Sequence, residues 1–181
     1  MLEKLIRGSY NLIRIAILKL RLRGKVTIPF VQPMRIRSQL MIQKGVRRAE
    51  IGRNFKLETD AKVRVINGGD LKIGDNVFVN CGSYITVMGK VSIGDGCMIG
   101  PGVMIFDHDH DYRAEGGIRA GKVIAGEITI ENNVWIGANS VILKGAVIHD
   151  DAVIAAGSII NKEIPAHTVV LQKRSLEIIP Y

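Results

Sequence analysis

The sequence of 181 residues has little cysteine, little proline and few aromatic side chains. Its two cysteines make neither a disulfide framework nor a four-cysteine zinc site, which favours a reducing compartment. Aromatic residues are 5% of the chain, too few for a base-stacking surface, so nucleic-acid binding is not indicated. The chain lacks an uncharged apolar run of about 18 residues, the length that a membrane-spanning helix needs, and shows no signal-peptide cleavage site. We therefore expect a cytoplasmic protein of one domain.

What the sequence does have is a six-residue period. From residue 130 to residue 160 every sixth residue is isoleucine, and a small residue follows each of the first five after four places (Val134, Ser140, Ala146, Ala152, Ser158). A helix repeats every 3.6 residues and a strand every two, so neither explains the period. A period of six fits a parallel β-solenoid, in which one isoleucine of each short strand stacks on the next inside the coil.

The same phase occurs upstream in three shorter runs, which begin at Ile51, Ile73 and Ile93. Since three hexads make one triangular coil, residues 45–165 predict about six coils. The hexads stop after Ile105 and resume near residue 128, so residues 106–127 form an inserted loop in the solenoid domain of residues 26–166. Loops inserted in a rigid repeat array usually carry function, and we expect the active site there. Residues 167–181 form a tail of mixed charge.

The N-terminal segment, residues 1–25, is predicted to be a basic amphipathic helix. It carries seven Lys and Arg residues against Glu3. A broad apolar face beside basic residues suits a helix that packs on the end of the solenoid or on another subunit, and equally a helix, residues 1–22, at a membrane surface. Both roles stay open. Residues 26–50, interrupted by Pro29 and Pro33, are expected to be a solvated coil.

The inserted loop begins with the densest polar cluster of the chain, Asp107 to Tyr112. A calcium-binding loop would need glycine at its sixth position and glutamate at its twelfth, where the chain has Tyr112 and Ile118. A zinc site built on His108 and His110, as in a metal-dependent hydratase, would need a third ligand from elsewhere. We expect no metal.

The third interpretation is a general base. An imidazole with a pKa near 6.5 can take the proton of a hydroxyl group as that hydroxyl attacks a thioester. Its second nitrogen must be held by a carboxylate or a carbonyl group. Asp107, Asp109, Asp111 or the backbone could supply that partner, and the sequence does not choose among them.

The segments 99–110 and 128–137 resemble the hexapeptide-repeat acyltransferases, in particular the galactoside, maltose and capsular-polysaccharide O-acetyltransferases. The resemblance covers roughly residues 71–165. It implies an all-β fold, the left-handed parallel β-helix, and a homotrimer with sites between subunits. It also implies acetyl transfer from acetyl-CoA to a hydroxyl of a sugar or of a cell-surface polysaccharide precursor.

In that family an ungapped count from Ile99 places the catalytic histidine on His110, with His108 as the second candidate. The family's acceptor-binding asparagine falls on Asn80, and Asp109 and Tyr112 are further candidates for acceptor contacts. The resemblance places acetyl-CoA contacts at five positions: Trp135, Ala138, Ala156, Asn161 and Lys162. It supports a sixth contact, Arg174, less well, because the Gly-x-Pro-Ala-Arg run that usually follows the last coil in the family is replaced here.

Two other functions remain in view. One is an N-acyltransferase acting on an amino sugar nucleotide. The other is a non-catalytic scaffold of the same fold at a membrane surface, against which the presence of Asn80, His110 and Trp135 argues.

Overall fold

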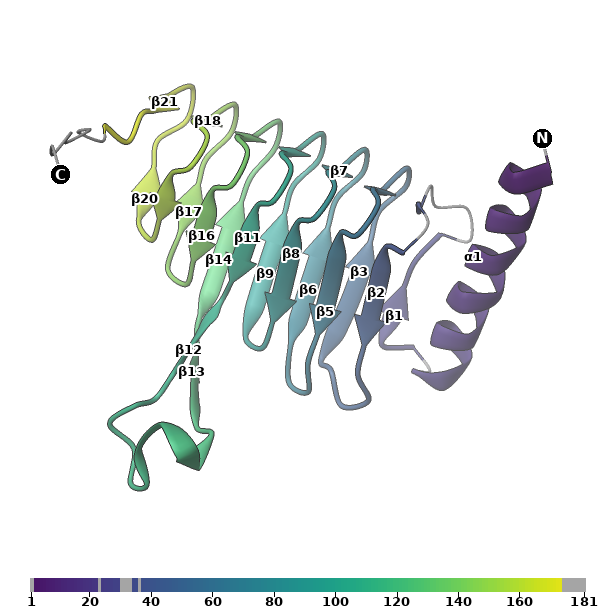
Figure 1. Ribbon diagram of the computed structural model, residues 1–181, viewed down its shortest axis with the longest axis horizontal. Helices are drawn as coiled ribbons and strands as arrows, with labels where there is room; N and C mark the ends of the chain where they lie inside the picture. The colour runs from purple at the N-terminus through teal and green to yellow at the C-terminus, as the bar shows by residue number, and fades with distance from the viewer. Residues whose placement is uncertain (1, 23, 30–33, 36, 174–181) are drawn as a thin grey trace, which may run out of the picture.

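The computed structural model describes residues 2–22, 24–29, 34–35 and 37–173, and it is a left-handed parallel β-helix capped by one helix (Figure 1). Three parallel sheets run the length of the molecule and form the flat faces of the coil. In stacking order, sheet A contains β1 (Val26–Thr27), β3 (Arg48–Ile51), β6 (Asp70–Ile73), β9 (Lys90–Ile93), β14 (Glu127–Ile130), β17 (Val147–Ile148) and β20 (Glu163–Ile164). Sheet B contains β4 (Lys56–Leu57), β7 (Phe78–Val79), β10 (Met98–Ile99), β15 (Trp135–Ile136), β18 (Val153–Ile154) and β21 (Val169–Val170). Sheet C contains β2 (Gln39–Ile42), β5 (Lys62–Val65), β8 (Tyr84–Val87), β11 (Met104–Phe106), β16 (Val141–Leu143) and β19 (Ile159–Ile160).

The hexad phase predicted the core. Ile136, Ile142, Ile148 and Ile154 are all completely buried. Consecutive hexads, however, lie on neighbouring faces rather than on one another. The stacked partners are one coil apart, as for Ile142, which is in register with residues of β11 and β19. The expectation that successive isoleucines stack directly was therefore wrong, because each hexad ends at a corner.

One corner of the solenoid is held by a ladder of short polar side chains. Asp75 Oδ1 accepts the backbone N–H of Arg53 at 2.7 Å, and Asp95 Oδ1 accepts that of Asp75 at 2.7 Å. Asn132 and Asp150 continue the ladder, at 2.9 and 2.7 Å. Each side chain satisfies a corner N–H that the sheets leave unpaired, so the ladder keeps neighbouring coils in register.

Within residues 26–50, the described residues are not the solvated coil that the sequence suggested. They contain β1, β2 and most of β3, and they bury apolar side chains such as Ile28, Leu40 and Val46. The apolar residues of this segment are not spaced six apart, so the sequence period does not reveal its strands, in which buried and less buried side chains alternate. Within the predicted tail, β21 pairs with β18 and adds a last strand to sheet B.

The helix α1 (Leu2–Arg21) lies across the first coil (Figure 1). Ile15 and Leu22 are 1% and 5% exposed and join the core, and the Asn11 side chain donates to the carbonyl oxygen of Met34 at 3.1 Å. One face of the helix therefore covers the open end of the solenoid, as one of the two predicted roles requires. Within the described residues, no helix combines the length and apolarity needed to cross a bilayer.

The inserted loop forms an arm that projects from the body between β11 and β14 (Figure 1). Its two strands, β12 (His108–His110) and β13 (Val123–Ala125), pair antiparallel, and the 3₁₀ turn η1 (Gly117–Ala120) lies beyond them. The polar cluster therefore begins at the base of this arm.

Candidate active site

The base of the arm is organised by a buried carboxylate. The Asp107 side chain is completely buried, and it accepts the backbone N–H groups of Met88 at 3.0 Å and Gly89 at 2.8 Å. A Cβ atom at Gly89 would collide with the carbonyl oxygen of Gly126, so only glycine allows the two backbone segments to approach this closely. Two N–H groups from the preceding coil thus fix the position of the Asp107 carboxylate.

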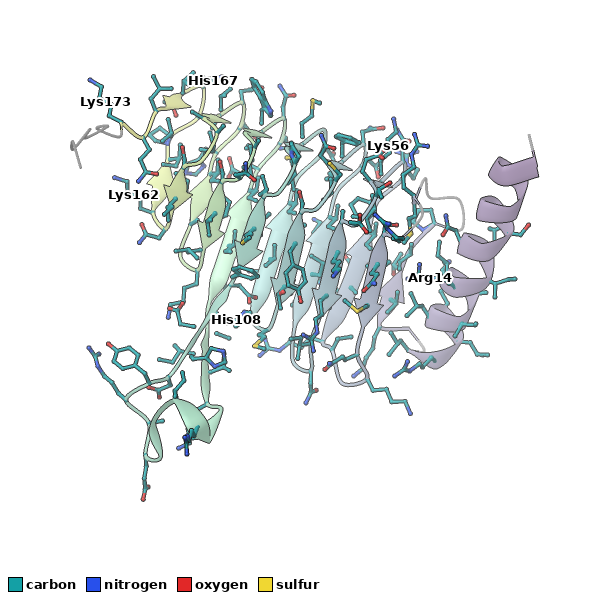
Figure 2. All side chains as sticks on the ribbon, viewed as in Figure 1. Arg14, Lys56, His108, Lys162, His167 and Lys173 are labelled. Atoms are coloured by element: carbon teal, nitrogen blue, oxygen red, sulfur yellow. The ribbon has the colours of Figure 1, made fainter. Side chains whose placement is uncertain are left out.

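The same carboxylate holds a histidine. His108 Nδ1 lies 3.0 Å from Asp107 Oδ1, and a carboxylate partner requires the tautomer in which Nδ1 carries the proton. The His108 side chain is 14% exposed, and its ring lies edge-on to Phe106 with ring centroids 6.2 Å apart. Figure 2 shows His108 where the arm joins the body. The imidazole is therefore oriented, and Nε2 is the nitrogen available to accept a proton.

The other predicted residues of the arm are arranged differently. The His110 side chain is exposed, and within the described residues its ring has no hydrogen-bond or ion-pair partner. Asp109 is paired with Lys144 at 2.8 Å, a contact that ties the arm to the coil of β16. Tyr112 is 64% exposed and lies against the guanidinium group of Arg113. The subunit alone thus gives an orienting partner to His108 and none to His110 among the residues that the structure describes.

A second region is a cavity of about 590 Å³ on the outer side of sheet B, where that sheet turns towards sheet C. Asn80, Trp135, Ala138 and Ala156, four of the predicted acceptor and donor contacts, line it together with apolar side chains such as Met98. Trp135 is 56% exposed, which leaves a broad aromatic surface for a ligand. Asn80 Oδ1 accepts the N–H of Cys81 at 2.8 Å, so its amide nitrogen is the group available to a ligand.

Asn161 and Lys162 do not line this cavity. Both are exposed, and they lie between β19 and β20, at the turn from sheet C to sheet A (Figure 2 for Lys162). Arg174 is outside the described residues. Among the described residues no three His, Cys, Asp or Glu side chains form a group that could hold a metal ion.

The cavity lies at the N-terminal ends of the strands of sheet C, and the arm lies at their C-terminal ends. The cavity includes Pro101, just before β11, whereas His108 follows β11. At about 3.3 Å per extended residue, the stretch of chain from one to the other spans on the order of 20 Å. One chain therefore does not bring the histidine and the cavity together.

Two features of the site were not predicted from the sequence. The first is the role of Asp107, which was one of several possible partners, together with the two N–H groups that hold its carboxylate. The spacing of Gly89 and Asp107, one coil apart, is the signal that could have indicated them. The second is the set of cavity residues Phe78, Met98 and Pro101, because apolar side chains on outward positions carry no motif.

Comparison with known proteins agrees with the fold. The family model for the bacterial transferase hexapeptide, six repeats, matches residues 70–107 and 127–162. The galactoside O-acetyltransferase of Escherichia coli is 38% identical over 122 residues, which are 67% of this chain and 58% of that protein. The chain spans 50 to 58% of the length of the first three curated relatives that it matches.

Two solved structures show the same fold. A hexapeptide-repeat acetyltransferase of Vibrio cholerae in complex with acetyl-CoA has a TM-score of 0.54 and 22% identity, covering 90% of this chain and 77% of that one. The N-acyltransferase AntD of Bacillus cereus, in complex with dTDP-4-amino-4,6-dideoxyglucose and coenzyme A, has a TM-score of 0.62 and 16% identity, covering 83% and 84%. These two likenesses show the fold, and the match to the family model shows that residues 70–107 and 127–162 resemble the hexapeptide repeat of the bacterial acyltransferases.

Proposed function

We propose that the protein transfers the acetyl group of acetyl-CoA to a hydroxyl group of a sugar or of a cell-surface polysaccharide precursor, with His108 as the general base. The observation that carries the proposal is the buried Asp107 carboxylate, which holds Nδ1 of His108 and leaves Nε2 to accept a proton. The names of the curated relatives and the acetyl-CoA complex of the structural neighbour support the reaction class.

In this reaction His108 Nε2 takes the proton of the acceptor hydroxyl as its oxygen attacks the thioester carbonyl carbon. The carbon–sulfur bond breaks, and the proton held on His108 passes to the departing sulfur, so that the products are the acetyl ester and free coenzyme A. Asp107 keeps the imidazole in one tautomer and stabilises the positive charge that the ring gains. A base placed in this way is worth about 10²- to 10⁴-fold in rate.

The cavity on sheet B fits the donor. Its apolar wall, with Trp135 and Met98 largely exposed, suits the uncharged pantetheine arm of coenzyme A. The small side chains of Ala138 and Ala156 let a ligand approach the coils closely. Asn80 on the rim supplies a polar contact for an acceptor hydroxyl. Lys162 is exposed and lies outside the cavity, so we propose that its ammonium group binds the phosphate groups of coenzyme A.

The proposal requires a second copy of the chain. Since His108 and the cavity are on the order of 20 Å apart along sheet C, the histidine of one subunit must meet the cavity of a neighbour. We therefore propose the homotrimer that the resemblance implies, with the acceptor bound between subunits. The exposed apolar residues Tyr112 and Ile118 on the arm and Ile159 on sheet C would be covered by such contacts.

His110 is the second candidate base, favoured by the ungapped count from Ile99. It lies two residues along the same strand, and its exposed ring would need an orienting partner from the neighbouring subunit. An N-acyltransferase acting on an amino sugar nucleotide is the second candidate function, supported by the likeness in fold to AntD. It would use the same donor cavity with an amine as acceptor.

The test compares His108→Gln, His110→Gln and the matched control His167→Gln, an exposed histidine on the far side of the last coil. Turnover is followed as free thiol released from acetyl-CoA in the presence of hydroxyl and amino sugar acceptors. We expect kcat to fall by about 10²-fold or more only in His108→Gln. A loss confined to His110→Gln would move the base to His110, whereas acetyl-CoA binding without any acceptor-dependent release would support the scaffold instead.

A further inference from the structure

The helix α1 has two different apolar faces, and the solenoid uses only one. Asn11, Ile15 and Leu22 are buried against the first coil, and Leu18 packs beside them. At 100° per residue these four positions fall within one narrow sector of the helix.

The opposite sector is also apolar and faces outwards. Leu12, Ile13, Ile17 and Leu20 are 41%, 59%, 57% and 75% exposed, and Ala16 between them is exposed as well. Figure 1 shows α1 at the end of the stack, with no other helix or strand of the described chain beyond it. A contiguous apolar strip of this kind is costly in water unless something covers it.

Basic residues border the strip on both sides. By the helical spacing, Arg14 and Arg21 lie on one flank and Lys19 on the other, between the packed face and the outward face. Arg14 Nη1 donates to the carbonyl oxygen of Ser38 at 3.3 Å, which holds that side chain against the first coil. Long basic side chains at the border of an apolar strip can reach the headgroup level while their stems remain among apolar groups.

The charge of the whole chain is divided in the same way. Residues 4–49 contain twelve Lys and Arg residues and no Asp or Glu, whereas residues 50–181 contain thirteen basic and sixteen acidic residues. The helix end of the solenoid is therefore strongly basic and the remainder slightly acidic. Two such ends facing each other would repel, which disfavours a second copy of the chain as the covering partner.

We propose that the outward face of α1 docks on the surface of an anionic bilayer, with Leu12, Ile13, Ile17 and Leu20 in the boundary between headgroups and acyl chains. Lys19 and Arg21 lie at the level of the lipid phosphates. This occupant satisfies both observations at once, because it covers an apolar strip and neutralises a basic end.

Docking also fixes how the arm stands above the lipid. In sheet C, β11 is three strand spacings from β2, or about 14 Å at ~4.8 Å per strand. With the ~10 Å diameter of the helix, His108 lies roughly 25 Å above the surface. The acceptor that it meets would then be a sugar held away from the bilayer rather than a lipid headgroup.

The test uses sedimentation of the full chain with phosphatidylcholine vesicles, with and without phosphatidylglycerol. It compares Ile13→Glu/Ile17→Glu with Val169→Glu/Leu171→Glu, a matched pair at the opposite end of the solenoid whose side chains are 63% and 70% exposed. Both double variants remove exposed apolar surface and add the same charge. We expect the parent and the Val169/Leu171 variant to bind anionic vesicles with similar affinity. The affinity of the Ile13/Ile17 variant for these vesicles should be lower by about tenfold or more. Binding should also weaken as the Debye length shortens from about 10 Å at 0.1 M salt to about 3 Å at 1 M.

Equal loss in both double variants would overturn the proposal, as would a parent protein that ignores anionic vesicles. Light scattering without lipid identifies the alternative: a parent mass that falls only in Ile13→Glu/Ile17→Glu would assign the strip to a second copy of the chain. Leu20→Glu, at the most exposed of these positions, repeats the test with one substitution, and melting curves show whether each variant is folded. The assay needs no acetyl-CoA, so it stands or fails separately from the proposed reaction.

Discussion

Replacing Asp107 by asparagine tests whether this carboxylate serves the fold, the chemistry or both. Asparagine has the same shape, and its oxygen can still accept the N–H groups of Met88 and Gly89. Those two bonds change from charge-assisted, about 1.5–3 kcal/mol each, to neutral, about 0.5–1.5 kcal/mol each. The expected destabilisation is the difference, about 2–3 kcal/mol in the free energy of unfolding, which a urea titration measures.

The effect on turnover should be larger than this loss of stability suggests. In Asp107→Asn the new amide group would donate to Nδ1 of His108, so the ring proton moves to Nε2 and the nitrogen that must accept the acceptor's proton is already occupied. We expect kcat to approach that of His108→Gln, about 10²-fold or more below the parent, at temperatures where the variant is folded. Full turnover in Asp107→Asn would refute the role of the pair, and so would a loss reversed simply by lowering the temperature.

Two further predictions concern the solenoid itself. Ile148→Ala should lower the free energy of unfolding by about 2–5 kcal/mol, because this side chain is completely buried, whereas Leu171→Ala, at a position that is 70% exposed, should change it much less; denaturant titration measures both. His149 donates towards Glu163 at 2.8 Å and Glu131 at 3.0 Å, and these carboxylates raise its pKa above the ordinary value. Because the folded pKa is the higher one, the stabilisation is complete below about pH 6.5 and disappears as pH rises through the folded pKa. The melting temperatures of the parent and His149→Gln should therefore differ at pH 6 and converge at high pH, and a constant difference would contradict the assignment.

The regular part of the fold could be predicted from the sequence because the coil repeats one physical requirement. Every strand must place one apolar side chain inward, and the isoleucines from residue 130 onwards meet that requirement without a gap. Residues 26–50 meet it too, through Ile28, Leu40 and Val46, but their corners differ in length and the period disappears. Periodicity thus detects regular corners as much as buried strands.

The site was less predictable because its parts come from different coils. Resemblance indicated Asn80, Trp135, Ala138 and Ala156, and the structure places all four at one cavity. The buried carboxylate of the polar cluster follows Gly89 by one coil, a spacing that has a meaning only once the coils are known. The position of this carboxylate depends on Met88 and Gly89, which the preceding coil places beside Asp107.

This arrangement links the repeat to the chemistry. A loop inserted in a solenoid has few contacts of its own, and most of this arm is exposed. At the base of the arm, Asp107 is fixed by the coils, because it accepts two N–H groups from the turn between β8 and β9. His108 is the next residue, so its ring takes its orientation from the rigid array rather than from the arm. The arm beyond it can then vary to suit an acceptor while the base stays where the solenoid holds it.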